Sequence, residues 1–294
     1  MKIYIIGSSG AIGYPLFNFL KKKINVLGTY HKNKKPGLIK FSLGNEFSEN
    51  RLLQKIKPED KVFFLSSYTS VPWIVKNKKK SKNLNFFSTK KFLAKLIRNK
   101  INFYYFSSAE VFNGKRGYYN EKSRTIPVNY YGKLKFRIEK YLNKTRYSNY
   151  HVIRLGRIVE FTKSYPCMIE DCYNVLLKPK AKMAVDNLFT ITHVNDFNKA
   201  IYKVIKKKKL PKILHICSGH AISRTRFADL IIDASTKSNL MHYTKCKFKD
   251  IKYNEKRAAK NNLDSSFTSK LLNVKYTKPK KIIFEKIKII EKKN

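Results

Sequence analysis

The sequence predicts an α/β fold in which helices cover both faces of a parallel β-sheet. Short apolar runs rich in β-forming residues alternate with segments of helical periodicity through the first half of the chain. A glycine-rich turn follows the first of these runs, and pairs of serines end two later ones. Apolar strands that alternate with helices are typical of parallel sheets buried on both faces.

The order of elements divides the chain into a regular first half and a less regular second half. The predicted strands span residues 2–6, 24–30, 38–43, 61–67, 101–108, 151–156 and 212–218. The predicted helices include the one that follows residue 129 and the segments 87–99, 166–177, 194–207, 224–234 and 282–293. We expect residues 1–157 to form a nucleotide-binding domain, with segments near 186–218 returning to it, and residues 158–294 to form mainly a smaller α/β substrate-binding part.

The chain is strongly basic, with 64 Lys and Arg against 19 Asp and Glu and a formal charge of +45. A cation excess of this size raises the hypothesis of nucleic-acid binding. However, the lysine runs lie along the whole chain, at 21–23, 76–82, 206–209 and 278–281, and such runs are typical of solvated faces. We therefore expect no specific nucleic-acid partner.

The cysteines argue against a metal site. Cys167, Cys172, Cys217 and Cys246 form no CxxC pair and no Cys/His cluster at zinc spacing, so neither a metal nor a disulfide framework is expected. Free thiols suit a reducing cytoplasm. No run reaches 18 apolar residues, so we expect no membrane span. The sequence leaves the oligomeric state open, a homodimer included.

The glycine turn indicates a dinucleotide site. Gly7, Gly10 and Gly13 form GxxGxxG directly after the first strand and at the opening of a helix. Small residues let the backbone approach a pyrophosphate, and the N–H groups and dipole of the helix N-terminus favour its charge. This arrangement predicts a Rossmann-type doubly wound sheet, in which Gly7, Gly10, Ala11, Ile12 and Gly13 contact the cofactor.

The end of the second strand bears on which dinucleotide binds. An NAD site usually has a carboxylate near this point for the ribose hydroxyls. The stretch GTYHKNKK offers none, and the next acidic residue is Glu46. His31 and Lys32 instead suit a 2′-phosphate, so we favour NADP(H) over NAD(H), with NAD(H) as the alternative.

A tyrosine and a lysine lie at the spacing that a reductase of one large class needs. Tyr131 and Lys135 share one helix face because they are four residues apart. A chain this rich in lysine also produces such pairs by chance, as Tyr118 with Lys122 shows. Ser108, at the end of a predicted strand and 23 residues before Tyr131, supplies independent support, since ligands bind at the carboxyl edge of such sheets.

The glycine turn, the strand-end serine and YGKLK, in this order, resemble the extended short-chain dehydrogenase/reductase superfamily. More closely, the chain resembles the dTDP-4-dehydrorhamnose reductase family of nucleotide-sugar enzymes. The matching stretches are residues 28–32, 66–71, 107–114, 131–139, 185–197, 213–231 and 257–272. The resemblance therefore spans nearly the whole chain.

The resemblance implies a function for each matched motif. Tyr131 would be the general acid that protonates the C4 oxygen of the sugar, and Ser108 would bind that oxygen. Lys135 would hold the nicotinamide ribose and lower the pKa of Tyr131 from its ordinary value of about 10. Further cofactor contacts are implied at Ser66, Ser67 and Tyr68, and contacts with the substrate diphosphate at Arg224, Arg226 and Arg257.

The resemblance leaves the reaction open. The motif SSAEVF is closer to the corresponding motif of nucleotide-sugar epimerases and dehydratases, and Ala258 stands where the reductases usually have proline. The leading prediction is NADPH-dependent reduction of a nucleotide-linked 4-keto sugar for surface polysaccharide biosynthesis. An epimerase or dehydratase of the same fold is the alternative, and a non-catalytic NAD(P)-binding regulatory or nucleic-acid-binding protein is a more remote one. His193 and His215, each in an apolar strand or at a helix start, are expected to be structural.

Overall fold

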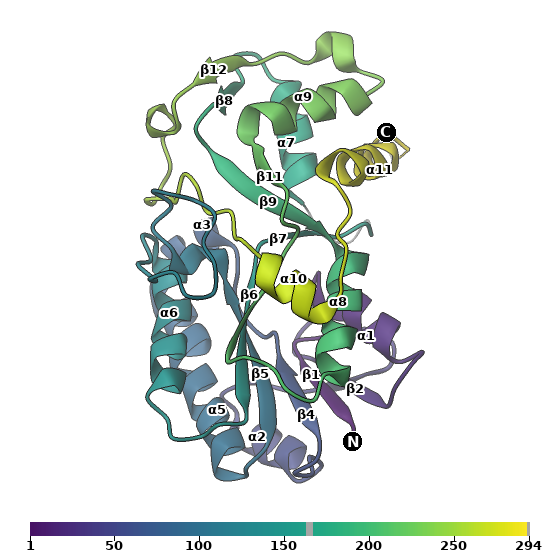
Figure 1. Cartoon of the computed structure of the whole chain (residues 1–294), viewed down its shortest axis with the longest axis vertical. Helices are drawn as coiled ribbons and strands as arrows, with labels where there is room; N and C mark the ends of the chain where they lie inside the picture. Colours follow the sequence, from purple (N-terminus) through teal and green to yellow (C-terminus); the bar gives the residue numbers. More distant parts are fainter. Residues whose placement is uncertain (163–166, 293–294) are drawn as a thin grey trace.

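The computed structural model describes residues 1–162 and 167–292, which form a large sheet domain with a second part stacked on one end (Figure 1). Seven strands form the large sheet in the order β10-β6-β5-β4-β1-β2-β3, and every neighbouring pair is parallel. Their bounds are β1 Ile3–Ile6, β2 Val26–Tyr30, β3 Leu38–Lys40, β4 Lys61–Phe64, β5 Asn102–Ser108, β6 Tyr150–Leu155 and β10 Ile213–Ile216. The chain leaves β1 toward β2 on one side and reaches β4 on the other, which creates a crevice at the carboxyl ends of β1 and β4.

Helices cover both faces of this sheet, so the doubly wound Rossmann-type prediction is confirmed. One face carries α1 (Gly13–Leu20) and α8 (Val194–Lys206), and the other carries α2 (Glu46–Leu53), α5 (Thr89–Arg98) and α6 (Tyr130–Asn143). Successive strand side chains point to opposite faces. In β1, Ile3 and Ile5 join the first core, while Tyr4 and Ile6 join the second. This two-sided burial explains the continuous apolar runs.

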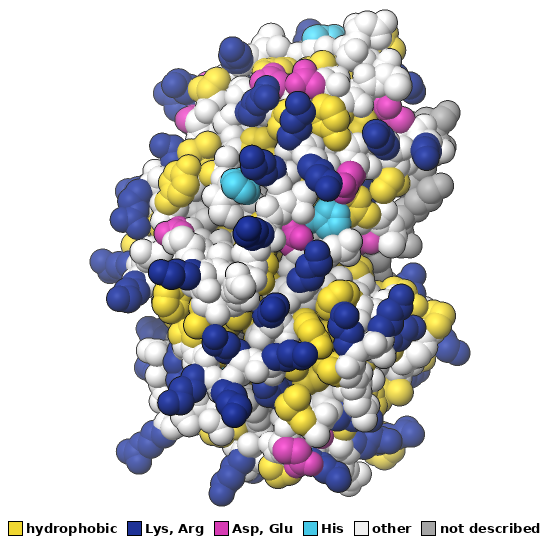
Figure 2. Space-filling model, turned by 45° about the vertical axis from the view of Figure 1, so that its right-hand side comes forward, with side chains coloured by type: hydrophobic (Ala, Val, Ile, Leu, Met, Phe, Trp, Pro, Cys, Tyr) yellow, Lys and Arg dark blue, Asp and Glu magenta, His cyan; other side chains and the backbone are white. Residues whose placement is uncertain are grey.

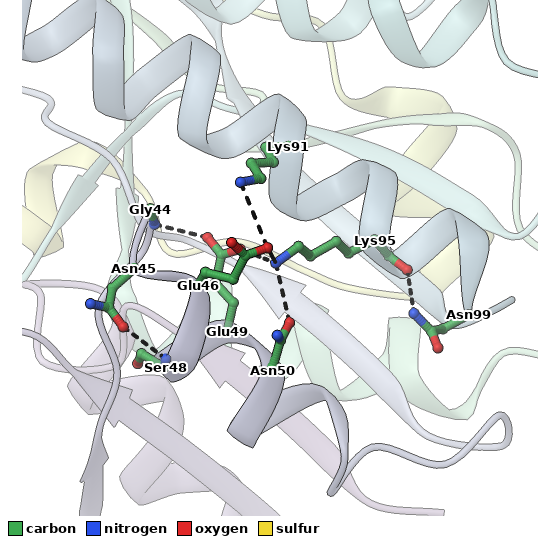
Figure 3. A network of polar contacts seen from close by, with 9 residues as sticks. All are labelled: Gly44, Asn45, Glu46, Ser48, Glu49, Asn50, Lys91, Lys95 and Asn99. Carbon is green, nitrogen blue, oxygen red and sulfur yellow. Dashed lines mark hydrogen bonds and ion pairs between the residues drawn. The ribbon is translucent and has the colours of Figure 1, made fainter.

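A polar contact ties α2 to α5 on the second face (Figure 3). The Glu49 carboxylate is 1% exposed and accepts from the backbone N–H of Gly44 at 2.8 Å. Lys95 Nζ lies 2.9 Å from Glu49 Oε2 and donates to Asn50 Oδ1 at 3.2 Å. The buried carboxylate is thus both paired and hydrogen-bonded, as burial of a charge requires.

Within the described residues, the second part contains two small sheets and the packed helices α7, α9 and α11, and it lies at the top of Figure 1. The strands are β7 Arg157–Val159, β9 Leu188–His193 and β11 Ala221–Ser223 in one sheet, and β8 Lys182–Ala184 and β12 Thr244–Cys246 in the other. The helices are α7 Met168–Leu176, α9 Arg224–Ala234 and α11 Pro279–Glu291. Apolar side chains of these elements form a separate core.

Short helical segments complete the described chain. They are α3 Val71–Lys76, α4 Lys78–Lys82, α10 Ser266–Leu272, the π-helical η1 Asn83–Ser88 and the 3₁₀ turns η2 Ala109–Val111, η3 Ser238–Leu240 and η4 Phe248–Asp250. The segment α10 packs on β10 and α8, below the second part (Figure 1). The C-terminal region therefore returns to the large sheet before it ends in α11.

The sequence predicts the seven parallel strands and the main helices correctly. Residue 166 of one predicted helix and residue 293 of another lie outside the described residues. The strands β7, β8, β9, β11 and β12 were not predicted. Four of them have only three residues, too few to show a period of two, whereas β9 has six and was missed as well. Within the stretch 186–218, β10 joins the large sheet, whereas β9 lies in the three-stranded sheet of the second part. The division at residue 157 into two functional parts stays a proposal.

On the face shown in Figure 2, the positive charge is spread rather than gathered. Lys and Arg side chains are distributed over the whole face shown in Figure 2, with uncharged atoms between them. A dispersed charge of this kind is typical of solvated surface lysines. Among the helices of the described residues, none combines the length and the apolar character that crossing a membrane would require.

Candidate active site

The glycine turn is packed tightly against the ends of β2 and β4. Gly7 has φ of +91° and its N–H donates to Thr29 Oγ1 at 3.0 Å. A Cβ on Gly7 would lie 2.8 Å from the backbone nitrogen of Ser66, and one on Gly13 would lie 2.5 Å from the carbonyl oxygen of Gly7. Both positions therefore require glycine, for backbone conformation at the first and for space at both.

The start of α1 fits the pyrophosphate of a dinucleotide. Ala11, Ile12 and Gly13 open the helix, where backbone N–H groups lack intrahelical acceptors. The helix has no side-chain cap and no acidic residue in its first turn. A Cβ on Gly10 would meet only the Gly7 carbonyl oxygen, at 3.6 Å, so its open side leaves room for a close approach. These features suit an anion at the helix N-terminus.

The other predicted cofactor residues border this turn from neighbouring strands. His31 and Lys32 are exposed directly after β2, and His31 Nδ1 lies 3.0 Å from Ser42 Oγ. Ser66, Ser67 and Tyr68 follow β4. The backbone N–H and C=O of Tyr68 bond to the side-chain amide of Asn85 in η1, at 2.9 and 2.8 Å. The backbone after β4 is thereby held in place beside the glycine turn.

Ser108 and Tyr131 line one pocket of about 170 Å³ at the carboxyl end of β5. Ser108 is the last residue of β5, and Tyr131 lies in the first turn of α6. The helix begins there because Asn129 is its N-cap, with Oδ1 accepting from the N–H of Gly132 at 2.7 Å. A larger hollow of about 510 Å³ at β3 and α2 contains none of the predicted catalytic residues. The pocket is lined by Thr69, Val71, Ser108, Ala109, Glu110, Tyr131, Leu155, Gly156, Arg157, Thr190 and Asn261.

Close packing explains how α6 reaches the pocket. A Cβ on Gly132 would lie 2.0 Å from the carbonyl oxygen of Glu110, so only glycine lets the helix approach the end of β5. Ser108 Oγ accepts from the N–H of Glu110 at 3.2 Å. Its own hydroxyl hydrogen is therefore available to donate toward Tyr131 or a substrate oxygen.

The expectation that Lys135 lowers the pKa of Tyr131 is wrong for this structure. Burial raises the pKa of Tyr131 above its ordinary value, the nearby Glu110 carboxylate raises it further, and hydrogen bonding with Ser108 opposes both. Tyr131 is 8% exposed, and desolvation disfavours its anion. Tyr131 thus keeps its proton, which is the state that a proton donor needs.

Lys135 is buried, and its own proton is held weakly. Its side chain is 4% exposed, and Nζ donates to the carbonyl oxygen of Phe106 at 2.8 Å. Burial lowers the pKa of Lys135 to about 7, against the opposing charge of Glu139. The ammonium lies 5.8 Å from the centroid of the Tyr131 ring. The two side chains share one helix face, as their spacing predicts.

A buried ion pair lies behind Lys135. Glu139, one turn further along α6, receives two hydrogen bonds from Arg154 of β6, at 3.1 and 2.7 Å. It also accepts from Ser107 Oγ of β5 at 2.5 Å. A bidentate pair of this kind fixes geometry as well as charge. It joins the helix that carries Tyr131 and Lys135 to the two strands beneath it.

Sequence reasoning missed the carboxylate in the pocket. Glu110 Oε2 accepts from Asn129 Nδ2 at 2.5 Å, and Oε1 accepts from Asn261 Nδ2 at 2.8 Å. The signal was present in the stretch FSSAEVF, where a carboxylate follows the strand-end serine by two residues. Asn261 has no such signal, because it comes from a distant loop of the second part.

Two of the three predicted substrate arginines lie close to the pocket. The positive charges of Arg224 and Arg257 both lower the pKa of Arg157, which lines the pocket. The Arg224 guanidinium lies 4.9 Å from the centroid of the Phe189 ring, and that of Arg257 lies 4.6 Å from the Tyr253 ring. Arg226, in contrast, is exposed, and its N–H bonds to the helix cap Ser223.

The two histidines of interest have structural contacts. His215 is fully buried in β10, its Nδ1 lies 3.1 Å from the carbonyl oxygen of Asp264, and burial lowers its pKa to about 4. His193 caps α8 by accepting from the N–H of Asn195 at 3.0 Å. Neither lines the pocket.

The glycine turn, the parallel sheet and the Ser108–Tyr131–Lys135 set define an enzyme of the extended short-chain dehydrogenase/reductase class, with a nicotinamide dinucleotide as cofactor. Residues 1–289 match the RmlD substrate binding domain family. The chain belongs to this family, and the resemblance stated from the sequence is confirmed.

Comparisons with individual proteins agree with the family. The chain is 26% identical over 286 residues to a GDP-6-deoxy-D-talose 4-dehydrogenase of Aggregatibacter actinomycetemcomitans, which covers 93% of this chain and 91% of the relative. A dTDP-4-dehydrorhamnose reductase from Clostridium acetobutylicum superposes with a TM-score of 0.81, at 20% identity over 99% of this chain and 100% of that one.

Two further solved structures share the fold. A dTDP-4-dehydrorhamnose reductase from Bacillus anthracis in complex with NADP has a TM-score of 0.79, at 17% identity over 96% of both chains. A UDP-glucose 4-epimerase from Thermotoga maritima with UDP-glucose has a TM-score of 0.82, at 17% identity over 100% of this chain and 99% of that one. At these identities the likeness establishes the fold and not the reaction.

We predict that Gly13→Ala lowers the free energy of unfolding by about 1–3 kcal/mol, because the added methyl group meets backbone atoms on two sides. Its Cβ would lie 2.5 Å from Gly7 O and 2.8 Å from Ser8 Cα. Urea denaturation measures the change. Gly10→Ala is the matched control, since its Cβ has 3.6 Å to the nearest atom, and it should lose less stability. Equal losses in the two variants would contradict the packing argument.

We predict that Lys135→Met raises the free energy of unfolding below pH 7, on the order of a few kcal/mol, because it removes a buried cation. The native lysine sheds its proton above about pH 7, whereas the unfolded chain keeps it to about 10.5. The wild type therefore gains stability as pH rises through this window, and the advantage of the variant shrinks.

Urea denaturation at pH 6 and pH 9 tests the Lys135 prediction. Lys133→Met is the control, because Lys133 is exposed on the same helix. It should show no pH-dependent gain. If Lys135→Met gave the same gain at both pH values, the depressed pKa of Lys135 would be refuted.

Proposed function

We propose that the chain reduces the 4-keto group of a nucleotide-linked deoxysugar with NADPH, as a cytoplasmic step of surface polysaccharide biosynthesis. The observation that carries the proposal is one pocket lined by both Ser108 and Tyr131, with buried Lys135 one helical turn behind Tyr131. These are the groups that carbonyl reduction needs: a donor for the carbonyl oxygen, a proton source and a cation. Membership of the RmlD substrate binding domain family supports it.

Each residue has a distinct part in the proposed reaction. The nicotinamide supplies a hydride to the carbonyl carbon when it is bound. Ser108 donates its hydroxyl hydrogen to the carbonyl oxygen and holds it in place. Tyr131, whose pKa is raised by burial, is protonated and transfers its proton to the same oxygen as negative charge develops there. Lys135 has N–H groups beyond the one bonded to Phe106, and these suit the ribose hydroxyls of the cofactor.

The two residues after β2 support NADP(H) over NAD(H). His31 and Lys32 are exposed beside the glycine turn, and no carboxylate lies between Thr29 and Glu46 to bind ribose hydroxyls. A 2′-phosphate would accept hydrogen bonds from both side chains. The similar reductase from Bacillus anthracis is in complex with NADP.

Arg224 and Arg257 suit the diphosphate of the substrate. Both lie near the pocket on its second-part side, and no salt bridge to a carboxylate is recorded for either within the described residues. Guanidinium groups bind phosphate oxygens in a bidentate manner. Arg226 is exposed on the same helix as Arg224 and would meet only a solvent-facing part of the nucleotide.

Glu110 favours a second candidate, an epimerase or dehydratase of the same fold. A carboxylate in the pocket beside Tyr131 could accept a proton from a sugar carbon next to the ketone. Both of its oxygens, however, already accept amide hydrogen bonds from Asn129 and Asn261, which favours a role in holding the pocket together. Among similar structures is a UDP-glucose 4-epimerase, so the test must separate the two reactions.

The deciding experiment follows the absorbance of reduced cofactor with a panel of nucleotide-linked 4-keto sugars. We expect one NADPH to be consumed for each sugar reduced, because a reductase does not recycle its cofactor. Tyr131→Phe should lower kcat about 100-fold or more while NADPH still binds, because only the proton donor is lost. Product formed without net NADPH consumption would identify an epimerase or dehydratase. A fully active Tyr131→Phe variant would exclude both reactions.

The cofactor preference is tested separately. Lys32→Asp should raise KM for NADPH by about tenfold and leave KM for NADH unchanged or lower, because a carboxylate repels the 2′-phosphate and suits ribose hydroxyls. Steady-state kinetics with each cofactor give both values. Lys34→Asp, an equal charge change in the same exposed loop, should change neither appreciably. An unaltered KM for NADPH in Lys32→Asp would remove Lys32 from the site.

A further inference from the structure

The pocket has a second polar wall, formed by residues that the proposed reduction does not use. Arg157 is the first residue of β7, and Thr190 lies in the neighbouring strand β9. The two strands are parallel, with Arg157 paired to Ile191, the residue after Thr190. Both line the pocket that contains Ser108 and Tyr131.

One atom of this wall is buried without a protein partner. Arg157 Nε is shielded from solvent and forms no hydrogen bond within the described residues, whereas the Thr190 hydroxyl interacts with the Cys217 thiol. Buried polar groups in native structures are nearly always hydrogen-bonded, so an orphaned donor in the pocket calls for an explanation. Arg157 as a whole is half-buried, and burial lowers its pKa.

The surroundings of Arg157 do not supply the missing partner. The Glu110 carboxylate attracts its charge, but the hydrogen bonds recorded for both Glu110 oxygens come from Asn129 and Asn261. Arg224 and Arg257 repel it. The Arg157 guanidinium lies 5.5 Å from the centroid of the Phe189 ring. A cation–π contact of this kind uses none of the N–H donors of the guanidinium.

The three arginines differ in where they lie. Arg157 lines the pocket with Ser108 and Tyr131, where the reacting carbonyl would lie, whereas Arg224 and Arg257 do not line it. Arg157 and Arg224 nevertheless contact the same ring, Phe189, at 5.5 and 4.9 Å from its centroid. Arg157 thus lies between the pocket for the carbonyl group and Arg224. This order matches a ligand in which the sugar is covalently joined to a diphosphate.

We propose that Arg157 recognises the sugar, while the diphosphate is bound by Arg224 and Arg257. This inference rests on the proposed function. The Arg157 guanidinium donates to a ring or hydroxyl oxygen of the sugar. The charges of Glu110 and Arg157 offset one another within the pocket, so the sugar is uncharged; a uronate carboxylate would add an unbalanced negative charge beside Glu110.

The test compares the affinity for a nucleotide sugar with that for its nucleoside diphosphate. The probes are UDP-glucose, dTDP-glucose and GDP-mannose against UDP, dTDP and GDP, measured by titration calorimetry on the full chain with NADPH present. Arg157→Met should weaken the binding of the nucleotide sugar by about 10- to 100-fold. It should weaken the binding of the diphosphate by less than about twofold, because the lost hydrogen bonds from the charged donor go to the sugar alone.

Matched variants separate this role from its neighbours. Arg224→Met should weaken the binding of both ligands by the same factor, because Arg224 binds the diphosphate that they share. Arg98→Met, an exposed arginine on α5, should weaken neither. Arg157→Lys keeps the charge but not the planar fork, and it too should weaken the nucleotide sugar selectively. Thermal unfolding of each variant shows that the chain is folded, and UDP-glucuronate should bind more weakly than UDP-glucose.

Three results would overturn the inference. Arg157→Met and Arg157→Lys could both weaken the sugar and the diphosphate equally, which would place Arg157 in the diphosphate site. Both variants could bind every probe as the wild type does, which would remove Arg157 from recognition. A wild type that binds none of the nucleotide sugars would remove the proposed function and this inference together, whereas either of the first two results leaves the proposed function standing.

Discussion

The buried pair of Glu139 and Arg154 is the interaction on which the proposed catalytic arrangement depends. It joins α6 to β6, and the hydrogen bond from Ser107 adds β5 to the same carboxylate. Removal of one partner from such a pair leaves an unpaired buried charge and costs about 3–5 kcal/mol. Because Ser108 follows Ser107 directly and Lys135 lies one turn before Glu139, this contact sets the distance between the strand-end serine and the helix α6.

Burial is the second constraint, and it shifts the pKa values of the two proposed catalytic groups in opposite directions. Desolvation raises the pKa of Tyr131 and lowers that of Lys135 to about 7, since each is driven toward its neutral form. The phenol is thereby kept protonated, whereas the lysine loses its proton near neutral pH. Two nearby carboxylates also contribute: Glu110 raises the pKa of Tyr131, and Glu139 raises the pKa of Lys135.

Much of the fold and part of the site could be predicted because their signals are local. The parallel strands appear as apolar runs, since both faces of the sheet are covered. The glycine turn is visible because backbone conformation and close packing at Gly7 and Gly13 permit no side chain. Strands β7 and β11 were missed, as three residues show no periodicity. The effect of Lys135 on Tyr131 was predicted wrongly, because spacing on a helix does not reveal how deeply both side chains are buried.

The sequence by itself determined the doubly wound fold, the dinucleotide turn and the shared helix face of Tyr131 and Lys135, because each depends on residues within a few positions of one another. Only the tertiary structure decided what surrounds them. Glu110 and Asn261 are far apart in the chain yet bonded, and Arg157 reaches the pocket through a strand of the second part. Burial and charge at a pocket are sums over groups from many segments, and spacing along the chain carries no record of that sum.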